Sequence, residues 1–270
     1  MQDDKLAKLT NILKDMGSAL LAFSGGVDST FLLKAMQIAE IKSVAVTASS
    51  EIVPFSEVSA ARETAKGLGM GHKVLEAGPL TEDFLRNSPE RCFFCKARLF
   101  KDLSDIALCE GFRFVLDGSN RDDLMDYRPG HKAASEYHVR SPLIEAGFSK
   151  SEVRELSKQL GLPTWDKPSS SCLATRIPYG RRITSEALKR IELSENVLRS
   201  LGFHQVRVRD HGYLARIEIE EDTMGPILRP EIRKNILETL RSLGYKFISL
   251  DLEGYKSGGM NRILDDNHSL

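Results

Sequence analysis

One stretch near the N-terminus decides the fold of this chain: Ala22-Phe23-Ser24-Gly25-Gly26-Val27-Asp28-Ser29-Thr30. The apolar residues 19–23 predict a short buried strand, and residues 31–36 have the pattern of a helix. The two glycines between them let the backbone approach an anion without a Cβ in the way, and the N–H groups at the helix start offer it positive partial charge. We therefore expect a strand, a phosphate-sized loop and a helix.

The polar side chains of this stretch are those that a nucleotide site needs, although Asp and Ser also cap ordinary helices. Ser24, Ser29 and Thr30 supply hydroxyl donors, and Asp28 suggests a magnesium ligand or a cap. The full string resembles the pyrophosphatase loop (PP-loop) of the ATP pyrophosphatases and lacks the Gly-Lys-Ser/Thr ending of a Walker loop. This resemblance implies that ATP is cleaved between its α and β phosphates to adenylate a carbonyl or carboxylate. The residues that it assigns to the nucleotide are Ser24, Gly25, Gly26, Val27, Asp28, Ser29 and Thr30.

The composition limits the class of protein. Lys plus Arg and Asp plus Glu number 38 each in 270 residues, so no global field attracts nucleic acid or an anionic membrane. The first residues lack the pattern of a signal peptide, and no apolar run approaches the ~20 residues of a membrane span. We expect a cytoplasmic protein whose four cysteines stay reduced.

Strands and helices alternate along the first part of the chain. Further strands are predicted at residues 43–48, 73–76 and 114–117, and helices at 5–16, 56–68, 94–108 and 149–160. This alternation predicts an α/β fold with a doubly wound parallel sheet, in which ligands sit beyond the carboxyl ends of the strands.

Two further segments follow predicted strands and therefore belong at that edge of the sheet. Thr47 and Ser49, which we predict to contact the nucleotide, end the second strand, and the segment 117–123 follows the fourth. The latter, Asp-Gly-Ser-Asn-Arg-Asp-Asp, resembles the Gly-Thr-Asn-x-Asp-Asp signature of several PP-loop enzymes. The resemblance implies that Gly118 and Asn120 contact the nucleotide and that Asp122 or Asp123 holds magnesium, with Asp123 as our candidate.

A polar loop separates this region from the rest of the chain. Residues 165–182 are too rich in Pro, Ser and Arg for a core, and Lys167 followed by Pro and Ser resembles the second pyrophosphate contact of the PP-loop family. We predict a PP-loop domain over residues 1–180 and a small α+β domain over residues 181–270. In the latter, two alternating segments at 205–209 and 214–219 predict half-exposed strands.

The cysteines narrow the chemistry. Cys92 and Cys95 form a C-x-x-C pair, Cys172 lies in the predicted loop, and Cys109 shares a helical face with apolar residues, so we expect Cys109 to be buried. A lone C-x-x-C fits half a zinc site, a redox pair or chance. A zinc site would need a fourth good ligand, which this sequence does not offer. A dithiol oxidoreductase would need a thioredoxin-like unit around the pair, which is also absent from the sequence. Three thiolates, however, can hold a [4Fe-4S] cluster and leave one iron open for sulfide. A thiolate or bound sulfide is a suitable nucleophile for an adenylated carbonyl. The loop at 24–30 and the three cysteines together therefore point to ATP-dependent sulfur insertion.

Five segments together resemble the sulfurtransferases that make the nickel-pincer nucleotide cofactor of lactate racemase. They are residues 24–30, 91–96, 168–180, 214–218 and 252–261. The resemblance implies that both carboxylates of pyridinium-3,5-biscarboxylate mononucleotide are adenylated and converted to thiocarboxylates, by an enzyme that forms hexamers. Arg176 and Arg216 suit the substrate phosphate, because a guanidinium offers a fork of donors.

The same resemblance leaves two sulfur donors open. In family members with a lone cysteine at the position of Cys172, that residue surrenders its own sulfur and becomes dehydroalanine. Other members with three cysteines hold a [4Fe-4S] cluster that carries an extra sulfide. Since this chain also has Cys92 and Cys95, we favour a cluster held by Cys92, Cys95 and Cys172 over sacrifice of Cys172.

Three alternatives remain at the level of sequence. Several tRNA thiolases join a PP-loop to a three-cysteine cluster, but neutral net charge and the absence of an evident RNA-binding module weigh against nucleic acid. A cluster-based or nucleotide-binding sensor would bind ATP without releasing pyrophosphate. An amide-forming ligase would need an ammonia source, for which no glutaminase-like segment is evident.

Overall fold

The computed structural model describes residues 2–125, 129–256 and 258–262, and the chain divides into two compact units. The first unit comprises Met1–Thr81 and Glu90–Ser170, and the second comprises Glu82–Pro89 and Ser171–Leu270. Residues 171–180, which we predicted as part of the PP-loop domain, thus group with the second unit. Ser257, in one of the five matched segments, lies outside the described residues.

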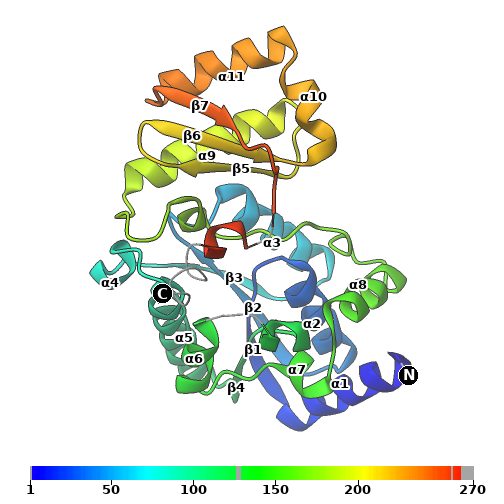
Figure 1. The fold of residues 1–270 in the computed structure, drawn as a ribbon. Coiled ribbons are helices and arrows are strands. Elements are labelled where there is room, and N and C mark those ends of the chain that lie inside the picture. The colour runs from blue at the N-terminus through cyan, green and yellow to red at the C-terminus, as the bar shows by residue number, and fades with distance from the viewer. Residues whose placement is uncertain (1, 126–128, 257, 263–270) are drawn as a thin grey trace. The chain divides into compact units, whose positions relative to one another are not determined.

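The first unit is one sheet with helices on its two faces (Figure 1). The strands follow the order β3-β2-β1-β4 and every pair is parallel, so the predicted doubly wound parallel sheet is confirmed. The strands are β1 (Ser18–Ala22), β2 (Lys42–Ser49), β3 (His72–Glu76) and β4 (Phe114–Leu116). The helices are α1 (Gln2–Met16), α2 (Val27–Ile38), α3 (Phe55–Gly67), α5 (Arg91–Glu110), α6 (Gly130–Glu136), α7 (Pro142–Ala146) and α8 (Lys150–Gln159), with a 3-10 turn η1 (Arg121–Met125).

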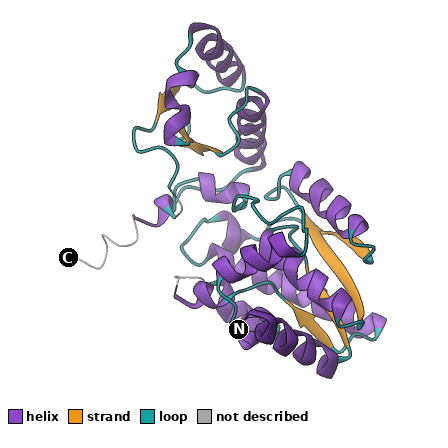
Figure 2. Cartoon of the chain, turned by 90° about the vertical axis from the view of Figure 1, so that its right-hand side faces the viewer, coloured by secondary structure: helices purple, strands orange, loops and turns teal. Residues whose placement is uncertain are grey.

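The central strand β1 shows why both faces of this sheet are covered. Successive side chains of a strand point to opposite faces, and a parallel strand buried on both faces reads as a continuous apolar run. Leu21 belongs to the core formed with α1, α2, α7 and α8, whereas Leu20 belongs to the core formed with α5 and α6. Figure 2 shows helices on both sides of the strands.

The second unit contains a smaller sheet in the order β5-β6-β7, antiparallel between β5 and β6 and parallel between β6 and β7. Its elements are α4 (Glu82–Leu85), η2 (Leu173–Arg176), α9 (Ser185–Ser200), β5 (Val206–Asp210), β6 (Leu214–Ile219), η3 (Glu221–Thr223), α10 (Met224–Ile227), α11 (Pro230–Ser242), β7 (Phe247–Leu250) and η4 (Gly259–Asn261). Apolar side chains of α9 and α11 and alternate residues of the strands form its core. The predicted small α+β fold is confirmed.

Two predictions about exposure were wrong. Strand β5 is not half-exposed: Arg207 and Arg209, on the face opposite its core residues, are only 4% and 5% exposed because their guanidinium groups are enclosed within the unit. Cys109 is exposed instead of buried. The buried stripe of α5 runs through Phe100, Leu103 and Ala107, which turns the end of the helix after Ala107 toward solvent. In the part of the chain that the structure describes, no helix is long and apolar enough to cross a membrane.

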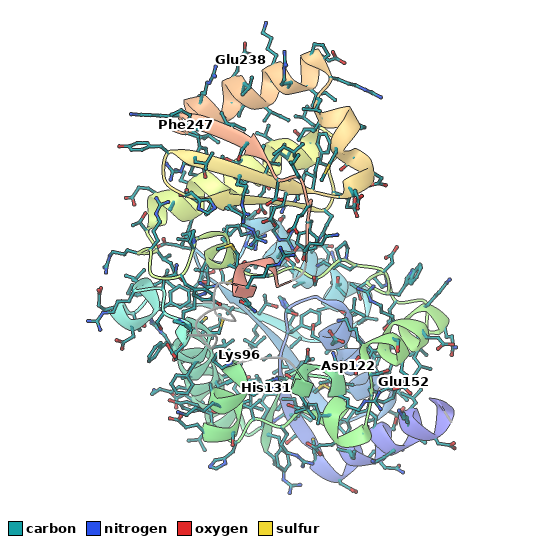
Figure 3. The ribbon with its side chains drawn as sticks, in the orientation of Figure 1. Lys96, Asp122, His131, Glu152, Glu238 and Phe247 are labelled. Carbon is teal, nitrogen blue, oxygen red and sulfur yellow. The ribbon has the colours of Figure 1, made fainter. Side chains whose placement is uncertain are left out.

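An ion pair joins the first helix of the chain to α8. Lys5 Nζ lies 2.7 Å from Glu152 Oε1 and donates to the carbonyl oxygen of Gly147 at 2.9 Å. Glu152, labelled in Figure 3, also accepts from the N–H of Ser149 at 2.8 Å, as part of the capping box that begins α8. The hydrogen bonds from Lys5 and from the Ser149 backbone lower the pKa of Glu152 to about 2.

This ion pair predicts a pH dependence of stability. The folded carboxyl stays ionised down to about pH 2, whereas in the unfolded chain it protonates below about pH 4.3. Its contribution is therefore present above the unfolded pKa and is lost as the pH falls through the folded pKa. Substitution Glu152→Gln keeps a capping-box acceptor but removes the charge, so the variant should be about 1 kcal/mol less stable at neutral pH and equal to the wild type near pH 2. Urea unfolding across this range measures the gap, and a gap that stays constant would contradict the assignment.

Gly25 predicts a second, local effect. Its φ is +65°, and a Cβ there would lie 2.8 Å from Cα of Ala61 in α3. Substitution Gly25→Ala should therefore lower the free energy of unfolding by about 1–3 kcal/mol. The matched control is Gly67→Ala at the end of the same helix, where a Cβ would meet nothing within 4 Å and should be neutral or stabilising by up to about 1 kcal/mol. Thermal unfolding of both variants makes the comparison, and equal midpoints would show that the loop does not approach α3 this closely.

Candidate active site

The loop between β1 and α2 forms the centre of the candidate site. Ser24 Oγ lies 3.1 Å from Ser29 Oγ and accepts a hydrogen bond from the N–H of Gly26 at 3.3 Å. Gly26 precedes α2 in an extended conformation without a side-chain cap. The N–H groups of the first turn of α2 are thus directed at whatever anion lies in the loop.

The segment after β4 packs directly against this loop, as expected from parallel pairing of β1 with β4. A Cβ on Gly118 would lie 3.0 Å from the backbone nitrogen of Ser29, so any larger residue would push the two segments apart by a few tenths of an ångström. Asn120 Nδ2 donates to Asp28 Oδ1 at 3.2 Å, and the N–H of Asn120 donates to Asp123 Oδ2 at 2.9 Å. Asp28 and Asp123 therefore both bond to one residue, and they supply the carboxylate oxygens that Mg²⁺ prefers.

A lysine that no sequence pattern singled out completes this junction. Lys150 Nζ forms an ion pair with Asp28 Oδ2. The N–H of the same lysine donates to Asp122 Oδ2 at 2.9 Å, so Asp122 lies beside the start of α8 (Figure 3). Lys150 and Asp28 are 122 positions apart, and in the sequence Lys150 shows only as part of a helix cap. Tertiary structure alone brings it to the loop.

The predicted pyrophosphate contact also lies at the loop. Lys167 Nζ donates to the carbonyl oxygen of Gly25 at 3.1 Å and to Glu57 Oε2 at 2.8 Å. Arg154 of α8 holds the segment that carries Lys167, because it donates to the carbonyl oxygens of Trp165 and Lys167, each at 2.9 Å. Glu57 and Arg154 carry no motif, so the sequence offered no signal for either.

The other residues predicted to contact the nucleotide lie in β2 and in the first turn of α2. Thr47 Oγ1 donates to the carbonyl oxygen of Phe23 at 2.8 Å and lies 2.8 Å from His72 Nε2; burial and the charge of Arg62 lower the pKa of that histidine. Val27 and Thr30 are buried in the first turn of α2. At Ser49 the backbone carbonyl oxygen accepts from the N–H of Ala77 at 2.9 Å.

The predicted cluster ligands lie in both units. Cys92 and Cys95 occupy the first turn of α5 in the first unit, where a spacing of three places them on one helix face. Cys172 precedes η2 in the second unit, and all three side chains are half-buried. Within either unit, over the residues described, no three His, Cys, Asp or Glu side chains group to hold a metal ion.

Buried ion pairs hold the turn that carries Cys172. The carboxylate of Glu195 accepts from Arg176 Nε at 2.8 Å and Nη2 at 3.1 Å, and Arg176 Nη1 donates to the carbonyl oxygens of Ser171 and Cys172. Burial alone would raise the pKa of Glu195, but the charge and hydrogen bonds of Arg176 hold it below its usual range. Arg176, predicted to bind the substrate phosphate, thus directs its donors to protein acceptors.

Arg216 lies in a more open place. It pairs with Asp251 at 2.8 Å and Glu218 at 3.2 Å, and it lines a small hollow with Lys256 and Arg262. Its Nε is buried and has no hydrogen-bond partner among the described residues. A buried donor without a partner is costly, and Nε is therefore the donor of Arg216 that an anion could use.

Comparison with known proteins gives relatives over the whole length. No protein-family model matches the chain. It is 41% identical over 263 residues to the pyridinium-3,5-bisthiocarboxylic acid mononucleotide synthase of Lactiplantibacillus plantarum, which covers 96% of this chain and 95% of that protein. It is also 41% identical over 266 residues to an uncharacterised protein of Synechocystis, with 98% and 99% covered. A tRNA-specific 2-thiouridylase of Thermoanaerobacter is 26% identical over 240 residues, which cover 72% of this chain and 66% of that enzyme.

The identity to the synthase extends across both units and confirms the resemblance predicted from the five segments. The thiouridylase is more distant and less completely covered, and its name indicates the transfer of sulfur to uridine in tRNA. The chain therefore belongs to the enzyme family of the pyridinium-3,5-bisthiocarboxylic acid mononucleotide synthase.

Proposed function

We propose that the chain is an ATP-dependent sulfurtransferase that converts the two carboxylates of pyridinium-3,5-biscarboxylate mononucleotide into thiocarboxylates, for the nickel-pincer cofactor of lactate racemase. The observation that carries the proposal is the meeting of Asn120, Lys150 and the loop at Asp28, with Lys167 on the carbonyl of Gly25. The identity to the synthase over nearly the whole chain supplies the substrate class. We propose that the enzyme acts in the cytoplasm as a homo-oligomer, a hexamer by resemblance.

The loop residues perform the first step. The N–H groups at the start of α2, with Ser24 and Ser29, bind the phosphates of ATP, and Lys167 exchanges Glu57 for the pyrophosphate. Asp28 and Asp123 would hold Mg²⁺, which offsets the charge of the leaving group. A carboxylate oxygen of the substrate attacks the α-phosphorus, the bond to the β-phosphate oxygen breaks, and pyrophosphate leaves.

The second step replaces AMP by sulfur. A sulfur nucleophile attacks the carboxyl carbon of the adenylate, and the C–O bond to AMP breaks. Cys92, Cys95 and Cys172 would hold a [4Fe-4S] cluster, whose open iron would supply a bound sulfide. In its absence Cys172 is the donor: its thiolate forms a thioester with the substrate, and loss of the Cα proton then breaks the Cβ–S bond, which leaves the thiocarboxylate and dehydroalanine. Arg216 is the candidate ligand of the substrate phosphate, because its Nε is buried without a partner among the described residues.

The role of Asp28 predicts a loss of pyrophosphate release. Substitution Asp28→Ala removes the carboxylate that Asn120 and Lys150 share, and the rate should fall at least about 10²-fold. The assay supplies ATP, Mg²⁺ and the biscarboxylate mononucleotide and measures pyrophosphate. Asp105→Ala, which removes an exposed carboxylate of α5 paired only with Lys101 among the contacts described, should leave the rate unchanged. A wild-type rate for Asp28→Ala would refute the site, and release that depends on tRNA instead would favour a thiolase.

The sulfur donor predicts an iron content. Protein purified without oxygen should contain roughly four irons and four sulfides per chain, and Cys95→Ser should lose them while Cys109→Ser, on the exposed end of the same helix, keeps them. A wild-type protein that stays iron-free after anaerobic reconstitution excludes the cluster. Mass spectrometry after turnover then tests sacrifice, which removes about 34 Da, one hydrogen sulfide, from the Cys172 peptide.

A further inference from the structure

Arg176 and Glu195 are a charged pair in a place where charge does not serve stability. Their side chains are 1% and 0% exposed. Desolvation of such a pair consumes most of its Coulombic attraction, and apolar residues of similar volume often stabilise a fold as well or better. Stability therefore does not explain why a guanidinium lies here. The acceptors that it binds point to another role.

One end of the Arg176 guanidinium binds the turn before η2. Arg176 Nη1 donates to the carbonyl oxygens of Ser171 at 2.6 Å and Cys172 at 2.8 Å. The same nitrogen, which carries two hydrogens, also lies 2.9 Å from the hydroxyl oxygen of Ser171 and 3.1 Å from that of Thr175. The Thr175 hydroxyl in turn donates to the carbonyl oxygen of Cys172 at 2.8 Å. The backbone on both sides of the Cys172 side chain is thus tied to one nitrogen.

The other end of the guanidinium is fixed to the core of the second unit. Glu195 holds Nε and Nη2 of Arg176, and its Oε1 also accepts from the N–H of Val208 in β5 at 3.1 Å. A second buried arginine, Arg209, pairs with Glu218 and donates to the carbonyl oxygen of Thr175 at 3.0 Å. A continuous line of hydrogen bonds therefore connects β5 to the carbonyl oxygen of Cys172.

We propose that Arg176 and Glu195 are positioning residues for Cys172. The buried pair fixes the turn and thereby the direction in which the Cys172 side chain projects from the backbone. This inference rests on the proposed part of Cys172 in sulfur transfer, and it gives Arg176 a role in place of phosphate binding. A sacrificed thiol needs its sulfur aimed at the adenylate, and a cluster ligand would have to hold the cluster so that the sulfide on its open iron reaches the same carbon; in either case a displacement of about 1 Å can cost about 10²-fold in rate.

The test uses the double variant Arg176→Met, Glu195→Gln in the full chain. Met fills an irregular apolar site, the glutamine amide keeps an acceptor for the Val208 N–H, and the net charge is unchanged. After reduction and iron chelation, iodoacetamide should alkylate the half-buried Cys172 at least about fivefold faster than in the wild type, because the turn is released. Cys109, exposed on α5, is the internal reference and should keep its rate.

Steady-state kinetics separate positioning from binding. In the double variant, kcat for thiocarboxylate formation should fall about 10²-fold while KM for the mononucleotide stays within about twofold. A large rise in KM with kcat maintained would show that Arg176 binds the substrate phosphate and would overturn the proposal. A folded double variant with an unchanged alkylation rate would do the same.

Two single variants complete the design. Arg199→Met removes another arginine that donates to Glu195. Among the contacts described, Arg199 binds none of the turn acceptors, so this variant should leave the alkylation rate of Cys172 unchanged. Arg176→Lys keeps the charge but not the fork and should fall between wild type and double variant, which preserves the test if the double variant does not fold. Alkylation needs neither ATP nor mononucleotide, so the alkylation rates can be interpreted even if the proposed function is wrong.

Discussion

The carboxylate of Asp28 is the point at which three parts of the first unit meet. It belongs to the loop after β1, and it receives Asn120 from the segment after β4 and Lys150 from the start of α8. Three stretches far apart in the chain are therefore held at one point. An anion bound by the first turn of α2 would lie among donors that are already oriented, which is the condition for electrostatic stabilisation of a leaving group.

Helix α8 organises the remainder of that site. Its capping box sets its first turn, where Glu152 also binds Lys5 and the backbone of Lys150 binds Asp122. One turn later, Arg154 fixes the carbonyls of the segment that carries Lys167. The same helix thus contacts the N-terminal helix, the acidic turn and the segment that carries Lys167, so a change in its position would reach all three.

The second unit uses charge in a different way. Arg176, Arg207 and Arg209 are buried, and Glu195 and Glu218 are buried with them. Burial, and then the charge of Arg176, lower the pKa of Arg207 to about 10, and the ring of Tyr255 covers its guanidinium at 5.0 Å. These groups are directed at the turn of Cys172 and at the face of β5, which explains why residues 171–180 group with this unit and not with the first.

The sequence by itself determined the parallel sheet, the loop, the segment around Asn120 and the family, because these depend on local patterns: apolar runs, glycines and short motifs at strand ends. It also located Lys167, through the Pro and Ser that follow. Only the tertiary structure decided that Lys150 meets Asp28, that Glu57 holds Lys167 and that Arg176 faces Glu195. A side chain's partner across many residues of chain leaves no local pattern. For the same reason the alternating pattern of β5 was misleading. Its arginines predict an exposed face, but Arg209 is buried because Glu218 of β6 pairs with it.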